Sequence, residues 1–247
     1  MKTIITIAKR EFMQYFYTPI AYVMASVFYI INGLLFYYLL NATNTPDIQI
    51  EGSIMQYIYG DILFWIVLFV LIPVITMRLI AEEKKEKTLE LILSYPITDL
   101  QIILGKFLGA FLFYTVLWIP TYLYVGILFM YQPPDIGPIL SAFFGVLLVG
   151  AFFISIGIFS SALTENQIIA AMINFGIILI LLLISSIESL IPSGVLKNVL
   201  GYLNFIWHID LFKIGIINTK DIIFFLSGTF LFLFLSVRIL ESRKWCR

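Results

Sequence analysis

The sequence has little charge and few of the residues that build cysteine or histidine sites. Only 12% of its 247 residues are charged, whereas about 25% is typical of soluble domains. The single cysteine, Cys246, excludes internal disulfide bonds and any four-cysteine metal centre. The net charge at pH 7 is zero, so no basic surface for nucleic acid is predicted.

Motifs of known catalytic sites are also missing. The sequence contains no G-x-x-x-x-G-K-[ST] loop for nucleotide phosphates, no G-x-S-x-G and no H-E-x-x-H. The lone His208, with Asp210 two residues away and Glu188 near the end of the fifth span, falls short of three or four convergent ligands, so no metal site is predicted. No acid is expected at the middle of a span, which argues against proton-coupled secondary transport.

The chain instead contains long apolar segments. Hydrophobic residues make up 61% of it, and apolar runs of about 18 residues or more recur, enough for a helix to cross a bilayer. Segments this apolar satisfy their backbone groups in lipid only as helices or closed barrels, and the runs are too long for barrel strands. We therefore predict an all-α integral membrane protein, with residues 1–247 as one domain. The six expected spans are 20–40, 62–79, 102–131, 139–163, 168–187 and 222–240, with a kink at Pro120 in the third.

Lysine and arginine predict the orientation, because these residues collect on the cytoplasmic side. With both termini in the cytoplasm, twelve fall inside and three outside. The inner set is Lys2, Lys9, Arg10, Arg78, Lys84, Lys85, Lys87, Lys106, Arg238, Arg243, Lys244 and Arg247. The outer set is Lys197, Lys213 and Lys220.

Two segments outside the spans are partly apolar. In residues 1–18, an arc of about 120° would gather six apolar side chains, while Ile7 and Met13 fall outside the pattern. Those six are Ile4, Ile5, Ala8, Phe12, Tyr15 and Phe16. We predict a helix in the inner membrane interface; the alternative is a disordered basic tail that only sets topology. For residues 189–221 we predict short helices at the outer interface or a partial dip into the membrane.

The densest run of charge lies between the second and third spans, in the element 80–97. We expect residues 78–87 to extend the second span as a helix, with Glu83 pairing with Lys87 and Glu82 with Lys85. Three apolar residues then share one side of a short amphipathic helix that Pro96 ends. They are Leu89, Ile92 and Leu93. From charge alone, a solvated loop that only sets topology is the alternative.

The order of residue types in this element resembles the cytoplasmic loop of ABC-2-type transporter permeases, most closely the gliding-motility type. The matching stretches are Glu82-Glu83-Lys84-Lys85, Thr88-Leu89-Glu90-Leu91, Pro96 and Leu104-Gly105-Lys106-Phe107. Lys87 departs from the pattern, because the family usually has glycine there. Further stretches match elsewhere in the chain: Lys9-Arg10-Glu11-Phe12 with Pro19-Ile20-Ala21-Tyr22, and Gly157-Ile158-Phe159-Ser160-Ser161 followed by Thr164-Glu165-Asn166-Gln167.

The resemblance implies a permease subunit in the bacterial cytoplasmic membrane that docks on a separate ATPase subunit. ATP and Mg²⁺ would bind to that partner, and no cofactor to this chain. It further implies a homodimer or a heterodimer with a second permease, contact with membrane lipid and a possible accessory membrane or periplasmic protein. The implied ATPase-coupling residues are Glu82, Glu83, Thr88, Leu89, Glu90, Ile92, Leu93, Pro96, Thr164, Glu165 and Asn166. The implied interfacial connecting helix carries Lys9, Arg10, Phe12 and Phe16.

Two functions remain open at this point, exporter and mechanical transmitter. An exporter needs a continuous pathway, for which Asn32 and Asn174 are the polar candidates deepest in the spans; the alternative is that they hydrogen-bond neighbouring helices. A transmitter would use ATPase strokes to act on an envelope or periplasmic partner without passing a substrate, and its outer segment 189–221 would hold that partner.

Overall fold

The computed structural model describes residues 2–44, 60–88, 97–131, 135–188 and 194–242, and every regular element within these ranges is a helix. Six helical stretches in the described part are long and apolar enough to cross a membrane, which confirms the predicted all-α fold. The elements in chain order are α1 (Lys2–Tyr17), α2 (Pro19–Asn44), α4 (Ile62–Thr76), α5 (Ala81–Lys85), α7 (Asp99–Trp118), η1 (Ile119–Thr121), α8 (Tyr122–Tyr131), α9 (Ile136–Leu163), α10 (Gln167–Glu188), α11 (Val195–Leu203), α12 (Phe205–Lys213) and α13 (Thr219–Ser242).

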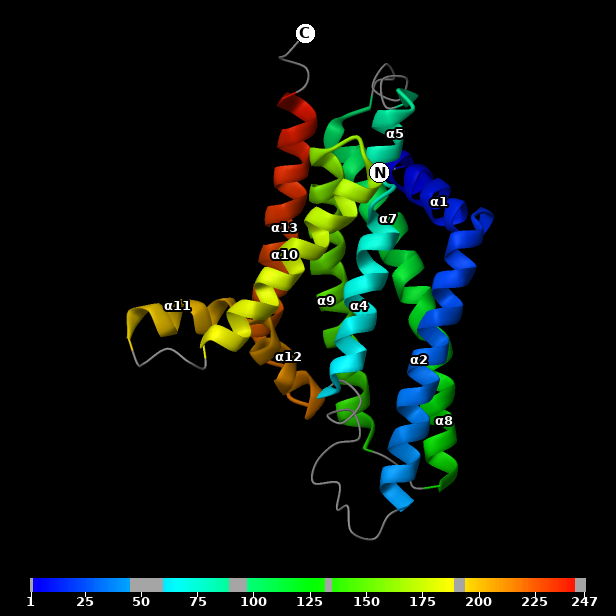
Figure 1. Cartoon of the computed structure of the whole chain (residues 1–247), viewed down its shortest axis with the longest axis vertical. Helices are drawn as coiled ribbons and strands as arrows, with labels where there is room; N and C mark the ends of the chain where they lie inside the picture. Colours follow the sequence, from blue (N-terminus) through cyan, green and yellow to red (C-terminus); the bar gives the residue numbers. More distant parts are fainter. Residues whose placement is uncertain (1, 45–59, 89–96, 132–134, 189–193, 243–247) are drawn as a thin grey trace.

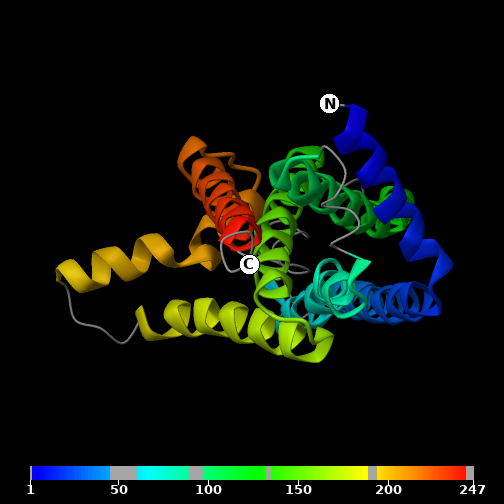
Figure 2. The same cartoon turned by 90° about the horizontal axis from the view of Figure 1, so that it is seen from above.

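Helix α9 forms the centre of the bundle and packs against α4, α7, α10, α12 and α13 (Figure 2). Glycines on α9 allow these helices to approach closely. A Cβ at Gly150 would lie 2.1 Å from the ring of Tyr114 on α7, and one at Gly157 would lie 2.1 Å from Thr76 Oγ1 on α4. The residues of this core are close-packed around α9, while α2 packs on α4, and α10 also contacts α4 directly.

The third span is bent where the sequence predicted a kink. Helix α7 ends at Trp118, the 3₁₀ turn η1 contains Pro120, and α8 continues to Tyr131. Proline lacks the N–H that an α-helix needs and its ring displaces the preceding carbonyl, so the chain tightens into a 3₁₀ turn. The Thr121 hydroxyl donates to the Trp118 carbonyl at 2.6 Å and satisfies one of the groups that the bend frees.

The predicted helix before the first span is present as α1, although its buried face differs from the predicted arc. Ile7, which we placed off the arc, contacts α7 at Gly105, and Glu11 is 4% exposed. Ile5 and Phe16, which we placed on the arc, are exposed. One side of the helix therefore packs on α7, and the other exposes apolar side chains together with charged ones, as expected of a helix at a membrane interface.

The segment between the fifth and sixth spans contains two short helices, α11 and α12. Figures 1 and 2 show α11 projecting sideways from the bundle beside α10, while α12 lies against the bundle. His208 on α12 lies 2.6 Å from an Asp221 carboxylate oxygen on α13 and 3.0 Å from the Tyr202 carbonyl on α11. The Asn204 amide also donates to Glu188 at 2.7 Å, so polar contacts fasten these helices to α10 and α13.

The expected helical extension of the second span is wrong at residues 77–80, where turns separate α4 from α5. The ion pairs also differ from those expected within the charged block. Arg78 pairs with Glu82 at 2.9 Å, while Glu83 pairs with Arg10 and Lys106, which lie far from it in the sequence. Glu82 keeps an i,i+4 partner, whereas tertiary partners replace the local one at Glu83, where Lys106 offers burial as well as charge.

Candidate functional site

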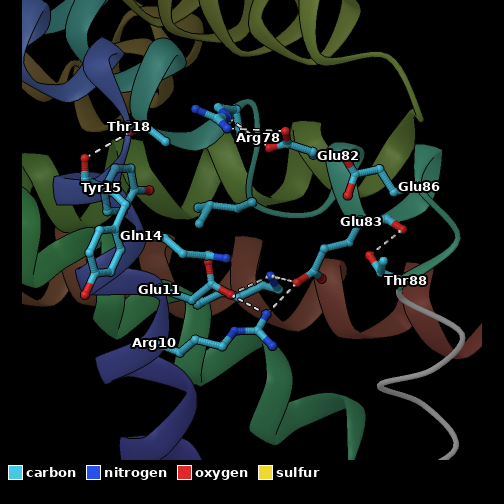
Figure 3. Close-up of a pocket in the computed structure, with 13 residues that line it drawn as sticks. Arg10, Glu11, Gln14, Tyr15, Thr18, Arg78, Glu82, Glu83, Glu86 and Thr88 are labelled. Carbon is cyan, nitrogen blue, oxygen red and sulfur yellow. Dashed lines mark hydrogen bonds and ion pairs between the residues drawn. The ribbon is translucent and has the colours of Figure 1, made fainter.

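The elements that the resemblance assigns to the coupling side gather at one end of the bundle. Figure 1 shows α1, α5 and the C-terminal end of α13 toward the same end of the molecule. A cavity of about 540 Å³ opens there between α1, the residues that follow α4, α5 and Lys106 on α7. Its lining is strongly charged, and Figure 3 shows the side chains that face it: Arg10, Glu11, Gln14, Tyr15, Thr18, Arg78, Glu82, Glu83, Glu86 and Thr88.

Helix α1 is seated on α7 through two glycines. A Cβ at Gly105 would lie 2.6 Å from Ile7 Cγ2, and one at Gly109 would lie 2.6 Å from Glu11 Cβ. Real Cβ atoms do not approach this closely, so only glycine permits the two helices to touch at these positions. The stacked rings of Tyr15 and Phe113, with centroids 4.4 Å apart, extend the same contact toward the bundle.

Four alternating charges join α1, α5 and α7 beside the cavity. Lys106 Nζ lies 3.0 Å from Glu11 and 2.8 Å from Glu83, and Arg10 lies 3.1 Å from Glu11 and 2.9 Å from Glu83 (Figure 3). The Lys106 side chain is 1% exposed and that of Glu11 is 5% exposed. The four charges sum to zero, so each buried charge is compensated by two opposite ones. We call these four residues the α1–α5–α7 ion network.

Tyr15 adds a neutral contact to the same wall. Its hydroxyl donates to the Ile75 carbonyl near the end of α4 at 2.8 Å. Burial raises the pKa of the Tyr15 phenol far above its ordinary value, the Glu11 carboxylate raises it further, and the Arg78 guanidinium partly lowers it. The phenol therefore stays protonated and remains a donor to α4 at every physiological pH.

A single serine on α9 forms hydrogen bonds with the backbone at the turns that follow α4. The N–H groups of Ile80 and Ala81 each donate to Ser161 Oγ at 3.0 Å, and the Ser161 hydroxyl donates to the Met77 carbonyl at 3.1 Å. One turn further, Lys84 Nζ donates to the Ala162 carbonyl at the end of α9. Helix α5 is thus held against α9 by two side chains.

The residue after α5 has an unusual backbone. Lys87 has φ of 57°, and among the described residues it alone has a positive φ without being glycine. This is the position where the resembling permeases usually carry glycine. The left-handed conformation that glycine favours is therefore kept here, although a lysine must adopt it at a cost.

Helix α7 begins, at the end of the bundle near the cavity, with a capping box. The Gln101 N–H donates to Thr98 Oγ1 at 3.4 Å, and the Thr98 N–H donates to Gln101 Oε1 at 3.4 Å. This cap starts α7 at Asp99, three residues before the predicted span, and so places Lys106 two turns into the helix.

The second inner turn lies directly after α9. The Asn166 N–H donates to Thr164 Oγ1 at 3.1 Å, and the Ile168 N–H donates to Asn166 Oδ1 at 2.9 Å, which caps the start of α10. Glu165 and Asn166 are exposed. Because Lys84 contacts Ala162, two residues before Thr164, the structure places the start of this turn near α5.

The predicted coupling residues divide into two groups. Glu82, Glu83 and Thr88 line the cavity, with the Thr88 hydroxyl donating to the Glu83 carbonyl at 3.3 Å. The others from the first inner loop lie outside the described residues: Leu89, Glu90, Ile92, Leu93 and Pro96.

The predicted residues of the interfacial helix lie on different sides of α1. Arg10 enters the ion network and Lys9 is exposed. The rings of Phe12 and Phe16 are 5.1 Å apart, and Phe16 also meets Phe113 at 5.8 Å. These aromatic side chains fix the second half of α1 near the membrane end of α7.

The two candidate pathway residues do not share a cavity. The Asn174 amide on α10 donates to Thr76 Oγ1 on α4 at 3.0 Å, beside Gly157. The Asn32 amide donates to the Phe28 carbonyl of its own helix at 2.8 Å and lines a small cavity of about 40 Å³. Asn174 therefore connects two spans, and Asn32 bonds within one.

Sequence reasoning missed the two residues that organise this site most, Glu11 and Ser161. Glu11 carried a usable signal: at 100° per residue it falls between Ile7 and Tyr15, inside the face that packs on α7, where an acid needs a buried partner. Ser161 stands in a stretch that resembles the family, but nothing in the sequence indicated its contacts, because its partners lie about 80 residues earlier in the chain.

Six membrane-spanning helices with a charged element at one end define a polytopic permease-like membrane protein. Residues 5–240 match the model of the family described as ABC-2 family transporter protein, and the chain belongs to that family. No curated protein matches the chain. The membership makes the chain a membrane subunit of a transporter system.

Proposed function

We propose that this chain is the permease subunit of an ATP-binding-cassette exporter in the bacterial cytoplasmic membrane, with both termini in the cytoplasm. A separate ATPase subunit binds and hydrolyses ATP with Mg²⁺, and its movement drives a substrate across or out of the membrane. Two permease subunits, identical or homologous, enclose the pathway between them. Within the family, the sequence features favour the gliding-motility type.

One observation carries the proposal: the inner charged element is built into the bundle. A loop that only sets topology needs positive charge but no tertiary contacts. Here Glu83 is bound to α1 and α7 through the ion network, and Lys84 is bound to the end of α9. An element fixed to three helices can pass a displacement to them, which is what a coupling element requires.

A mechanical transmitter is the second candidate, and helix α11 favours it. Val195, Leu196 and Tyr202 on this short helix are 81%, 60% and 59% exposed, and Figure 1 shows α11 projecting from the bundle. An apolar outer helix that stands away from its own bundle suits a membrane or periplasmic partner. In this case the ATPase stroke acts on that partner and no substrate passes.

The test is a pull-down of the full chain from detergent, followed by identification of co-purifying proteins. Leu89→Asp/Leu93→Asp places charge in the predicted docking helix, and Val195→Asp/Leu196→Asp makes the same chemical change on the outer helix. We expect an ATPase with a Walker motif to accompany wild type and the outer variant but not the inner variant.

The outcomes separate the candidates. A further partner that only Val195→Asp/Leu196→Asp loses would favour the transmitter over the exporter. If no ATPase accompanies wild type, or the inner variant retains it fully, the coupling function is overturned. The charged element is then explained as a loop that only sets topology.

A further inference from the structure

The chain between α4 and α5 depends on one hydroxyl group from another helix. Ile80 and Ala81 have N–H groups that donate to Ser161 Oγ, and both residues are fully buried, as is Ser161. The same hydroxyl donates to the Met77 carbonyl. A helix break is normally flexible, because its freed backbone groups lose the bonds that keep a helix straight. Here Ser161 binds three of these groups and holds the break in one conformation.

The contacts of α5 lead away from its own span. Lys84, which is 6% exposed, donates to the Ala162 carbonyl at the C-terminal end of α9, where the helix dipole favours a cation. Glu83 binds Lys106 on α7 at 2.8 Å. The covalent link from α5 back to α4, by contrast, passes through the turns at 77–80.

We propose that Ser161 is a positioning residue for coupling: it fixes α5 to α9, so that a displacement of the inner element moves α9 and α7 instead of bending the chain at residues 77–80. The inference rests on the proposed function, since it concerns how an ATPase stroke enters the bundle. Ser161 acts through the backbone of Ile80 and Ala81 and touches neither ATP nor substrate.

Ser160 provides a matched control. It is the neighbouring residue on α9, is equally buried and carries the same hydroxyl, but that hydroxyl donates to Ile156 within its own helix at 2.9 Å. Ser161→Ala and Ser160→Ala therefore delete the same atom at the same depth. Only the first frees the backbone groups of another segment.

The first measurement is amide hydrogen exchange of residues 77–81 in the purified full chain. Two buried donors lose their acceptor in Ser161→Ala, so we expect their exchange to rise about tenfold or more over wild type. Ser160→Ala is expected to leave that segment at the wild-type rate. Equal exchange in the two variants would overturn the assignment of Ser161, whether or not an ATPase is found.

The second measurement uses the complex of the chain with its co-purifying ATPase. We expect Ser161→Ala to retain the ATPase in the pull-down while ATP hydrolysis by the complex falls severalfold, with Ser160→Ala near wild type. A purely structural role would lower the yield of complex and leave the rate per complex unchanged. Loss of the ATPase from wild type itself would count against the proposed function instead.

A second variant covers the case in which Ser161→Ala fails to fold. Lys84→Met keeps the apolar length of the side chain and removes the contact with Ala162, while Ser161 keeps its bonds to Ile80 and Ala81. We expect hydrolysis per complex to fall severalfold while exchange of residues 77–81 remains slow. Wild-type hydrolysis by this variant would overturn the route through α9.

Discussion

At the scale of single residues, the least replaceable side chain of the inner site is Lys106. It is 1% exposed and lies within 3.0 Å of Glu11 and Glu83. Removing one member of a buried ion cluster leaves its partners charged without compensation. Arg10 touches the same two carboxylates, but its side chain is 49% exposed and water can replace it.

We therefore expect Lys106→Met to lower the free energy of unfolding by about 3–5 kcal/mol, and Arg10→Met by no more than about 1 kcal/mol. Thermal unfolding of both variants in the same detergent measures the difference. A Lys106→Met protein as stable as Arg10→Met would show that the buried cluster contributes no more than a surface pair.

The backbone conformation of Lys87 allows a test in which the substitution is expected to raise stability. A lysine in the left-handed region costs about 1–2 kcal/mol, and glycine adopts the same φ freely. We expect Lys87→Gly to stabilise the chain by up to about 1 kcal/mol. Lys85→Gly, two residues earlier within α5, is expected to destabilise it by about 0.5–1 kcal/mol.

Thermal unfolding midpoints of the two glycine variants check the sign. Both variants remove a lysine side chain and its charge, so the comparison isolates the backbone. If both substitutions destabilise equally, the left-handed turn after α5 is not required in the folded protein.

At the scale of elements, the seating of α1 on α7 depends on the absence of two side chains. A Cβ at Gly109 would lie 2.6 Å from Glu11 Cβ and 2.9 Å from the Ala8 carbonyl oxygen. We expect Gly109→Ala to push α1 away and destabilise the protein by about 1–3 kcal/mol. Gly126→Ala in α8 meets no atom within 4 Å and is expected to be neutral or slightly stabilising.

Limited proteolysis in detergent measures directly how firmly α1 is held on α7. We expect cleavage within α1 to become faster in Gly109→Ala and to stay at the wild-type rate in Gly126→Ala. Equal resistance of all three proteins would mean that α1 does not depend on close contact with α7.

The elements that the sequence predicts well are those whose signal is local. The six apolar spans, the bend at Pro120 and the helix before the first span follow from hydropathy, from a missing N–H and from a 100° periodicity. The break at residues 77–80 has no local signal. It depends on Ser161, and only the folded bundle brings that hydroxyl to Ile80 and Ala81.

The candidate site divides in the same way. The order of charges in the first inner loop predicts an element of which Glu82, Glu83 and Thr88 line the cavity, and the turn at 164–166 follows the residue that Lys84 contacts. The pairing of Glu83 could not be predicted, because its favoured local partner Lys87 lies past the end of the helix, whereas the buried Lys106 and the half-exposed Arg10 lie 2.8 Å and 2.9 Å from it. A local rule fails where tertiary contacts offer stronger partners.

At the scale of the whole molecule, the proposed orientation makes a prediction at the two ends of one helix. Helix α13 runs from Thr219 to Ser242, with Lys220 exposed near its start and the native Cys246 just beyond its end. Twelve of the fifteen lysines and arginines lie on the side assigned to the cytoplasm. This bias places Cys246 inside and Lys220 outside.

We expect a membrane-impermeant maleimide applied to intact cells to leave wild type unlabelled and to label Cys246→Ser/Lys220→Cys. Permeabilised cells should show both thiols labelled, which controls for access. Because a single helix separates the two positions, a correct topology allows only one of them to react from outside. Labelling of wild-type Cys246 in intact cells would show that the true orientation is the reverse of the proposed one. The α1–α5–α7 ion network would then lie outside, where a cytoplasmic ATPase could not dock on it.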